Sequence, residues 1–89
     1  MLVQLTGDVD IAVKDEVSAR LDAAAAGADV VDIDLSQVDY ADSTALGLFI
    51  RLRNRMHERG GSVRLVAPSP RMRKLLDYAG LGHVFEIVE

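Results

Sequence analysis

The sequence predicts a small α/β protein, with a mostly parallel four-stranded sheet packed by three helices. Strand-like and helix-like segments alternate in the order β-α-β-α-β-α-β, which favours crossover connections and parallel pairing. The composition, 49% hydrophobic and 27% charged, is typical of a folded domain. The 89 residues suffice for one such domain, which we expect to span residues 1–89.

The first half of the chain predicts two strands and a helix. Residues 2–6, LVQLT, alternate apolar and polar side chains as a strand does. Apolar residues recur at helical spacing from about 11 to 26, and Gly27 ends this helix. Residues 29–35 are rich in β-branched side chains and predict the second strand. The face of this strand expected to be buried consists of Val31, Ile33 and Leu35.

The second half predicts two helices and two strands. A helix runs from about 43 to 59 and is closed by two glycines. Residues 62–67 predict the third strand and residues 84–88 the fourth. Between these strands, Ser69 and Pro70 mark the start of the third helix. Ser is a preferred cap, and Pro is well tolerated at the first helical position.

The helix at 43–59 presents three different arcs when its residues are placed at ~100° intervals. The arc expected to face the core contains Ala45, Leu48, Phe49, Leu52 and Met56. A second arc, with Arg51, Arg55 and Glu58, is expected to face solvent. The third arc carries no charge and contains Ser43, Leu46, Gly47, Ile50 and Asn54. Either this neutral arc widens the contact with the core, or it is an exposed docking stripe beside Ser43. The pattern of one helix leaves both interpretations open.

Asp42, Ser43 and Thr44 stand where the second strand passes into this helix. All three residue types are preferred helix caps, which is the simplest interpretation. The carboxyl ends of parallel strands also gather functional groups, and a helix N-terminus accommodates an anion through its unpaired amides. A phosphorylated Ser43 would add roughly two negative charges and disrupt a partner docked on the neutral arc. The second interpretation is therefore a phosphorylation switch.

We expect no enzyme, no cofactor and no metal site. His57 lies about 21 Å along the same helix from Ser43 and cannot serve as its base. The chain has no cysteine, and no glycine-rich phosphate loop follows a strand. Acids at the ends of strands could suggest a magnesium site, but such acids are more often turn and cap residues. These acids are Asp8, Asp10, Asp32 and Asp34.

The charge distribution and hydropathy limit the partners. The net charge is −4, with acids concentrated in residues 1–45 and bases in residues 46–89. We expect no nucleic-acid binding, because no aromatic residue lies among the bases to stack on a nucleobase. No apolar segment is long enough to insert into a bilayer, and the N-terminus has no signal-like pattern. The absence of cysteine suits a cytoplasmic protein.

Three segments of the chain resemble, in order, those of a STAS domain, the family named for sulphate transporters and anti-sigma factor antagonists. They are LVQLTGDVD (2–10), VVDIDLSQVDYADSTALGLFIRL (30–52) and GGSVRLVAPSPRMRKLLDYAGLGHVFEI (60–87). The most specific pieces are L-x-G-x-x-D near the start, D-L-S at 34–36 and D-S-T-x-L-G at 42–47. The resemblance covers nearly the whole chain and implies a small α/β domain with a partly parallel sheet.

The resemblance to the antagonist branch also implies a function. The unmodified domain would bind an anti-sigma factor that is itself a serine kinase, so that a sigma factor is released. The kinase would phosphorylate the serine after the motif aspartate, which is Ser43 here, with Thr44 as a weaker candidate; a phosphatase would reset it. The implied partner-binding residues are Asp42, Ser43, Thr44, Leu46, Gly47, Ile50 and Asn54.

Departures from the family pattern suggest alternatives. Ala45 stands where the motif usually has Gly. The strand that usually precedes residues 2–6 and the helix that usually follows residues 84–88 are missing. Strand 2–6 is therefore expected to have an exposed edge that could pair with a second copy. The alternative functions are an unphosphorylated cytoplasmic STAS subunit of an ABC-type lipid transporter, or a scaffold in a stress-signalling assembly.

Overall fold

The centre of the protein is a sheet of four parallel strands in the order β1-β2-β3-β4. The computed structural model describes all 89 residues. The strands are β1 (Leu2–Val9), β2 (Val30–Ala41), β3 (Ser62–Val66) and β4 (Glu86–Val88). The helices are the 3-10 turn η1 (Ile11–Val13), α1 (Lys14–Gly27), α2 (Ser43–Glu58) and α3 (Pro70–Tyr78). The predicted order of elements and the parallel sheet are confirmed.

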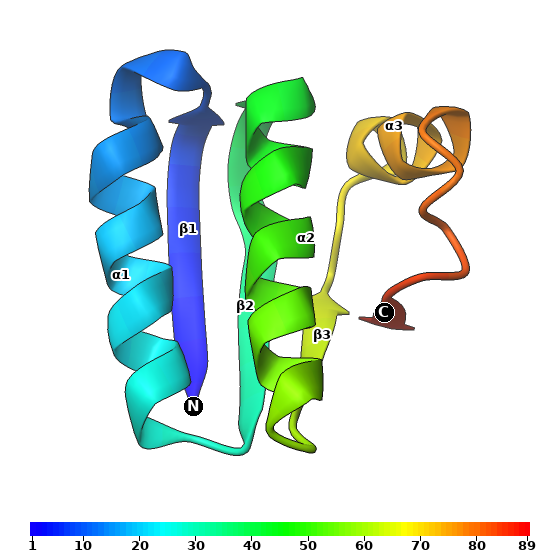
Figure 1. Cartoon of the computed structure of the whole chain (residues 1–89). Coiled ribbons are helices and arrows are strands. Elements are labelled where there is room, and N and C mark those ends of the chain that lie inside the picture. The colour runs from blue at the N-terminus through cyan, green and yellow to red at the C-terminus, as the bar shows by residue number, and fades with distance from the viewer.

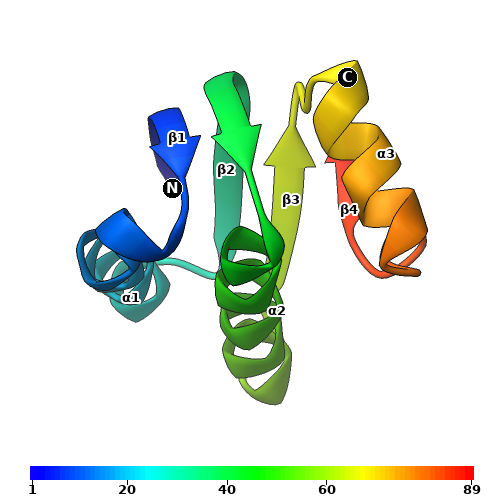
Figure 2. The ribbon, with the colours of Figure 1, turned by 90° about the horizontal axis from the view of Figure 1, so that it is seen from above.

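Two of the helices cover the same face of the sheet. α1 and α2 lie side by side over β1 and β2, whereas α3 lies apart from them, near the β3–β4 end (Figure 1, Figure 2). Parallel strands all end at the same edge of a sheet, so the turns into α1, α2 and α3 lie toward one end of the molecule. The start of α2, which carries Ser43, is at this end, at the top of Figure 1.

A single cluster of 22 buried apolar residues forms the core, with contributions from the sheet and from α1, α2 and α3. Phe49 is its largest fully buried side chain. The core face predicted for the helix at 43–59 is confirmed, since its five members are all buried. The predicted inward face of the second strand is confirmed as well, with Val31, Ile33 and Leu35 at most 1% exposed.

Several boundaries differ from the predicted ones because pairing and capping extend the elements. β1 and β2 continue to Val9 and Ala41, since their pairing persists past two register shifts near the left-handed Gly7 (φ 70°). The helix predicted from about residue 11 begins instead as the η1 turn. Asp10 caps this turn by accepting a hydrogen bond from the Ala12 amide at 3.0 Å. Capping of this kind satisfies an amide that a helix end leaves free.

The strand predicted to have an exposed edge, β1, lies at one end of the sheet. The Arg20 guanidinium donates a hydrogen bond to the Gln4 carbonyl oxygen of this strand at 2.8 Å. One acceptor on β1 is therefore already occupied by a side chain of the same molecule, which makes the edge less available for pairing. Pairing of β1 with a second copy stays a prediction.

Candidate functional site

The carboxylate of Asp42, and not the Ser43 hydroxyl, caps α2. Asp42 has the extended backbone of an N-cap residue, and its Oδ1 accepts a hydrogen bond from the Thr44 amide at 2.9 Å. Ser43 is the first residue of α2 and is exposed. Its hydroxyl makes no hydrogen bond with any other residue. Because the capping role is filled by Asp42, the local fold does not require the Ser43 hydroxyl.

The neutral arc of α2 divides into exposed and buried members. Ser43, Gly47 and Asn54 are exposed, and Ile50 is half-buried and packs against the core. Leu46 is only 5% exposed, so its expected place on the docking stripe is wrong for the isolated chain. The two interpretations left open by the helix pattern each describe part of the arc. Its aliphatic members widen the core contact, and its small and polar members face solvent.

Gly47 has no role in the packing of its own domain. A Cβ atom added there would meet nothing within 4 Å, and its backbone is not in the left-handed region. Glycine inside a helix is less stable than alanine, by roughly 0.5–1 kcal/mol. Neither close packing nor a special backbone conformation explains a glycine here, and its effect is to keep the surface beside Ser43 bare.

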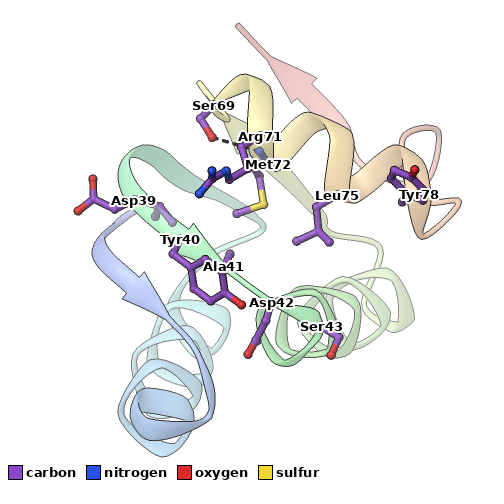
Figure 3. Close-up of a pocket in the computed structure, with 11 residues that line it drawn as sticks. Asp39, Tyr40, Ala41, Asp42, Ser43, Ser69, Arg71, Met72, Leu75 and Tyr78 are labelled. Atoms are coloured by element: carbon purple, nitrogen blue, oxygen red, sulfur yellow. Dashed lines mark hydrogen bonds between the residues drawn. The ribbon is translucent and has the colours of Figure 1, made fainter.

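A groove of about 410 Å³ lies on one side of the α2 N-terminus, between the end of β2 and α3. We call it the β2–α3 groove (Figure 3). Tyr40 and Tyr78 are its most prominent exposed apolar side chains, at 46% and 93% exposed. Asp39 and Asp42 come from the strand side, and the Arg71 guanidinium extends from α3. The lining residues are Val38, Asp39, Tyr40, Ala41, Asp42, Ser43, Ser69, Arg71, Met72, Leu75 and Tyr78.

A second groove, of about 280 Å³, lies between η1, the start of α1 and the exposed side of α2. We call it the η1–α2 groove. Its lining residues are Ile11, Lys14, Thr44, Gly47, Leu48 and Arg51. Ile11 is 73% exposed, which is high for a large aliphatic side chain. Consecutive residues of α2, Ser43 and Thr44, each line a different groove, so the start of α2 forms the ridge between them.

Asp32 and Asp34, which were expected at the end of a strand, lie inside β2 because its pairing continues to Ala41, and both have local structural partners. Both Asp32 carboxylate oxygens accept hydrogen bonds from Arg64, at 2.6 and 2.8 Å, and this guanidinium holds the pKa of the carboxyl below its ordinary value. The Ser36 amide donates to Asp34 at 2.9 Å and lowers the pKa of that carboxyl. No three His, Asp or Glu side chains come together in an arrangement that could hold a metal ion.

None of the helices combines the length and the apolar character that crossing a membrane would require.

Sequence reasoning identified the start of α2 but not the side chains around it. Ile11, Lys14, Arg71 and Tyr78 reach the two grooves from segments far from residue 43, and Tyr40 reaches the β2–α3 groove from the end of β2. Arg51 was assigned to a solvated arc of its helix, and the structure places it on the rim of the η1–α2 groove. The sequence does contain large aliphatic and aromatic side chains near the ends of elements, namely Ile11, Tyr40 and Tyr78. Only the fold shows that these side chains lie in the grooves beside the start of α2.

The fold is that of anti-sigma factor antagonists of known structure. SpoIIAA in its unphosphorylated form superposes with a TM-score of 0.84 over 99% of this chain and 78% of that chain, at 21% identity. The phosphorylated form of SpoIIAA, from Bacillus, superposes with a TM-score of 0.76 at 22% identity, over 99% of this chain and 81% of that one. The STAS domain of a SulP transporter from Vibrio cholerae has the same fold, with a TM-score of 0.72 at 16% identity, over 99% of this chain and 71% of that one.

The chain belongs to the STAS domain family. The family model described as "Mlab, STAS domain" matches residues 1–89. The anti-sigma-B factor antagonist of Bacillus subtilis is 34% identical over 86 residues, which cover 96% of this chain and 78% of that protein. The resemblance inferred from the motifs is confirmed.

Proposed function

We propose that this protein is an anti-sigma factor antagonist controlled by phosphorylation of Ser43. In its unmodified form it binds an anti-sigma factor that is a serine kinase, and the bound sigma factor is released. The kinase then transfers a phosphate to Ser43, which ends the complex, and a serine phosphatase restores the active form. The protein itself is not an enzyme in this cycle.

The observation that carries the proposal is the free hydroxyl of Ser43 at an exposed helix start. A serine that caps its own helix would have to give up that hydrogen bond to accept a phosphate, whereas here Asp42 provides the cap. The first turn of α2 tolerates the added anion because its amides and helix dipole favour negative charge. Modification of Ser43 can therefore change the surface without unfolding the domain.

The surroundings of Ser43 support a docking surface in place of a catalytic site. The bare Gly47 and the exposed Tyr40 are suited to contact with another protein, since aromatic residues are enriched in interface cores. No histidine lines either groove, so Ser43 has no serine–histidine pair of the kind that activates a hydrolase nucleophile. The partner-binding residues that we retain are Asp42, Ser43, Thr44, Gly47, Ile50 and Asn54.

The direct test is intact-mass analysis after incubation with ATP and the cognate anti-sigma kinase. We expect the wild-type protein to gain one phosphate, Ser43→Ala to gain none, and Thr44→Ala to gain one. The matched pair separates the two adjacent hydroxyls. Phosphate uptake by Ser43→Ala at the wild-type rate would show that the site is assigned to the wrong residue.

A second candidate is an unphosphorylated cytoplasmic STAS subunit of an ABC-type transporter. The observation in its favour is that the same fold occurs as a domain of a transporter, the SulP transporter of Vibrio cholerae, which is of another transporter class. This function predicts that the protein co-purifies with a transporter ATPase from its own cells and that Ser43 carries no phosphate there. Co-purification with an anti-sigma kinase would support the first function instead.

A further inference from the structure

The cationic side chains divide into those with partners inside the protein and those without. Six of the ten Lys and Arg side chains donate hydrogen bonds or form ion pairs with other residues: Arg20, Arg53, Arg55, Arg59, Arg64 and Arg73. The other four, Lys14, Arg51, Arg71 and Lys74, have no such partner. Three of these four line the two grooves beside Ser43, and only Lys74 does not.

Two of the unpartnered cations, Lys14 and Arg51, share the η1–α2 groove. Both are exposed, and no acidic residue lines this groove with them. Lys14 is also the first residue of α1, where the helix dipole makes a positive charge unfavourable. Asp15 and Glu16 follow it in the same turn, but neither forms an ion pair with it. The groove is therefore a positively charged surface with no charge compensation across it.

The shape of the η1–α2 groove favours a protein partner. Its α2 side is open at Gly47, where no side chain intrudes, and its η1 side carries the exposed aliphatic chain of Ile11. A partner segment can thus place a carboxylate between the two cations while an apolar neighbour contacts Ile11. Opposite charges arranged in this way set the register of a complex and speed its formation.

We propose that the η1–α2 groove binds an acidic side chain, Asp or Glu, of the anti-sigma kinase, between Lys14 and Arg51. The inference rests on the proposed function, because it names the chemistry that the same partner must present. The β2–α3 groove carries Asp39 and Asp42 as well as Arg71, whereas the charged residues of the η1–α2 groove are both cations, so the two sides of the Ser43 ridge differ in charge. A partner with an acidic group at one groove is held in a single orientation.

This arrangement also explains how phosphorylation ends the complex. Ser43 precedes Thr44, which lines the η1–α2 groove, and it lies about 6 Å along the helix axis from Gly47. A phosphate on Ser43 brings roughly two negative charges next to the docked carboxylate. Like-charge repulsion between this phosphate and the docked carboxylate then opposes binding. The modification acts on the interface without altering the fold.

The test is the dissociation constant of the unmodified protein for its cognate anti-sigma kinase at about 50 and 300 mM salt, with Lys14→Glu/Arg51→Glu as the variant. We expect the wild type to bind more weakly at the higher salt, because screening reduces the attraction. The double variant should bind at least tenfold more weakly at low salt and should lose this salt dependence. Lys74→Glu is the matched control, and its affinity should stay within twofold of wild type.

A neutral version, Lys14→Gln/Arg51→Gln, removes the charges without adding repulsion. It keeps the inference testable if the Lys14→Glu/Arg51→Glu variant does not fold. It should lose at least threefold in affinity with an unchanged unfolding temperature. Binding by both variants within twofold of wild type, or an equal loss in Lys74→Glu, would overturn the inference and leave the proposed function intact. A wild-type protein that does not bind the kinase at all would overturn both.

Discussion

Replacing Gly47 with alanine should stabilise this protein while weakening its function. The residue lies inside α2, its backbone is not left-handed, and a Cβ atom there meets nothing within 4 Å. The added methyl group therefore causes no clash. Alanine also restricts the unfolded chain, and an exchange of glycine for alanine in a helix interior is worth about 0.5–1 kcal/mol.

The size of this effect makes it measurable. For a domain of 60–100 residues, 1 kcal/mol corresponds to about 4–8 °C in the midpoint of thermal unfolding. Gly47→Ala should therefore raise the midpoint by roughly 2–8 °C in a circular dichroism melt. The same methyl group projects from the bare surface between Ser43 and Arg51. We expect it to weaken binding to the kinase by tenfold or more, which is about 1.4 kcal/mol.

Gly60→Ala provides the matched control because the same substitution should have the opposite effect on stability. Gly60 is equally open, but its φ of 76° is left-handed, a conformation that costs an alanine roughly 1 kcal/mol. Its melting midpoint should fall and its kinase affinity should not change. If Gly47→Ala lowers the midpoint, or raises it with full binding retained, the reasoning about the bare surface is refuted.

Three further predictions concern stability. Phe49→Ala removes a fully buried ring and should cost about 3–5 kcal/mol in urea unfolding, and a loss under 1 kcal/mol would contradict the central place of Phe49 in the core. Ala67 has a left-handed φ of 51°, so Ala67→Gly should raise stability by about 0.5–1 kcal/mol; a destabilised variant would show that this strain is absent. Because Arg64 lowers the pKa of Asp32 in the folded state, this ion pair stabilises the protein above the unfolded pKa near 4 and is lost as the pH falls through the folded value. Asp32→Asn should accordingly be less stable than wild type at pH 7, and this difference should shrink as the pH falls below about 4; a pH-independent difference would count against the pair.

The sequence patterns predicted the order and type of the elements because periodicity and end signals agreed along most of the chain. The helix at 43–59 is α2 at Ser43–Glu58, and Ser69 caps α3 by accepting a hydrogen bond from the Met72 amide at 3.1 Å. The ends of β1 and β2 were predicted too early. Polar and glycine residues interrupt the alternation there, while backbone pairing continues through irregular registers.

The candidate site could be predicted only in part. The position of Ser43 at the end of a parallel strand followed from the alternation of elements, and the structure agrees. The burial of Leu46 did not follow, because a helix pattern does not say how widely neighbouring elements cover it. The two cations of the η1–α2 groove, Lys14 and Arg51, are 37 residues apart in sequence (51 − 14), and only the packing of α1 beside α2 brings them together.

The dissociation constant of the cognate anti-sigma kinase, measured with the unmodified protein and with the protein phosphorylated on Ser43, tests the central claim most directly. Both forms should show the same thermal unfolding midpoint to within a few degrees, because the helix start tolerates the phosphate. We predict that the phosphorylated form binds at least tenfold more weakly. Equal affinities of the two forms would contradict a switch at Ser43.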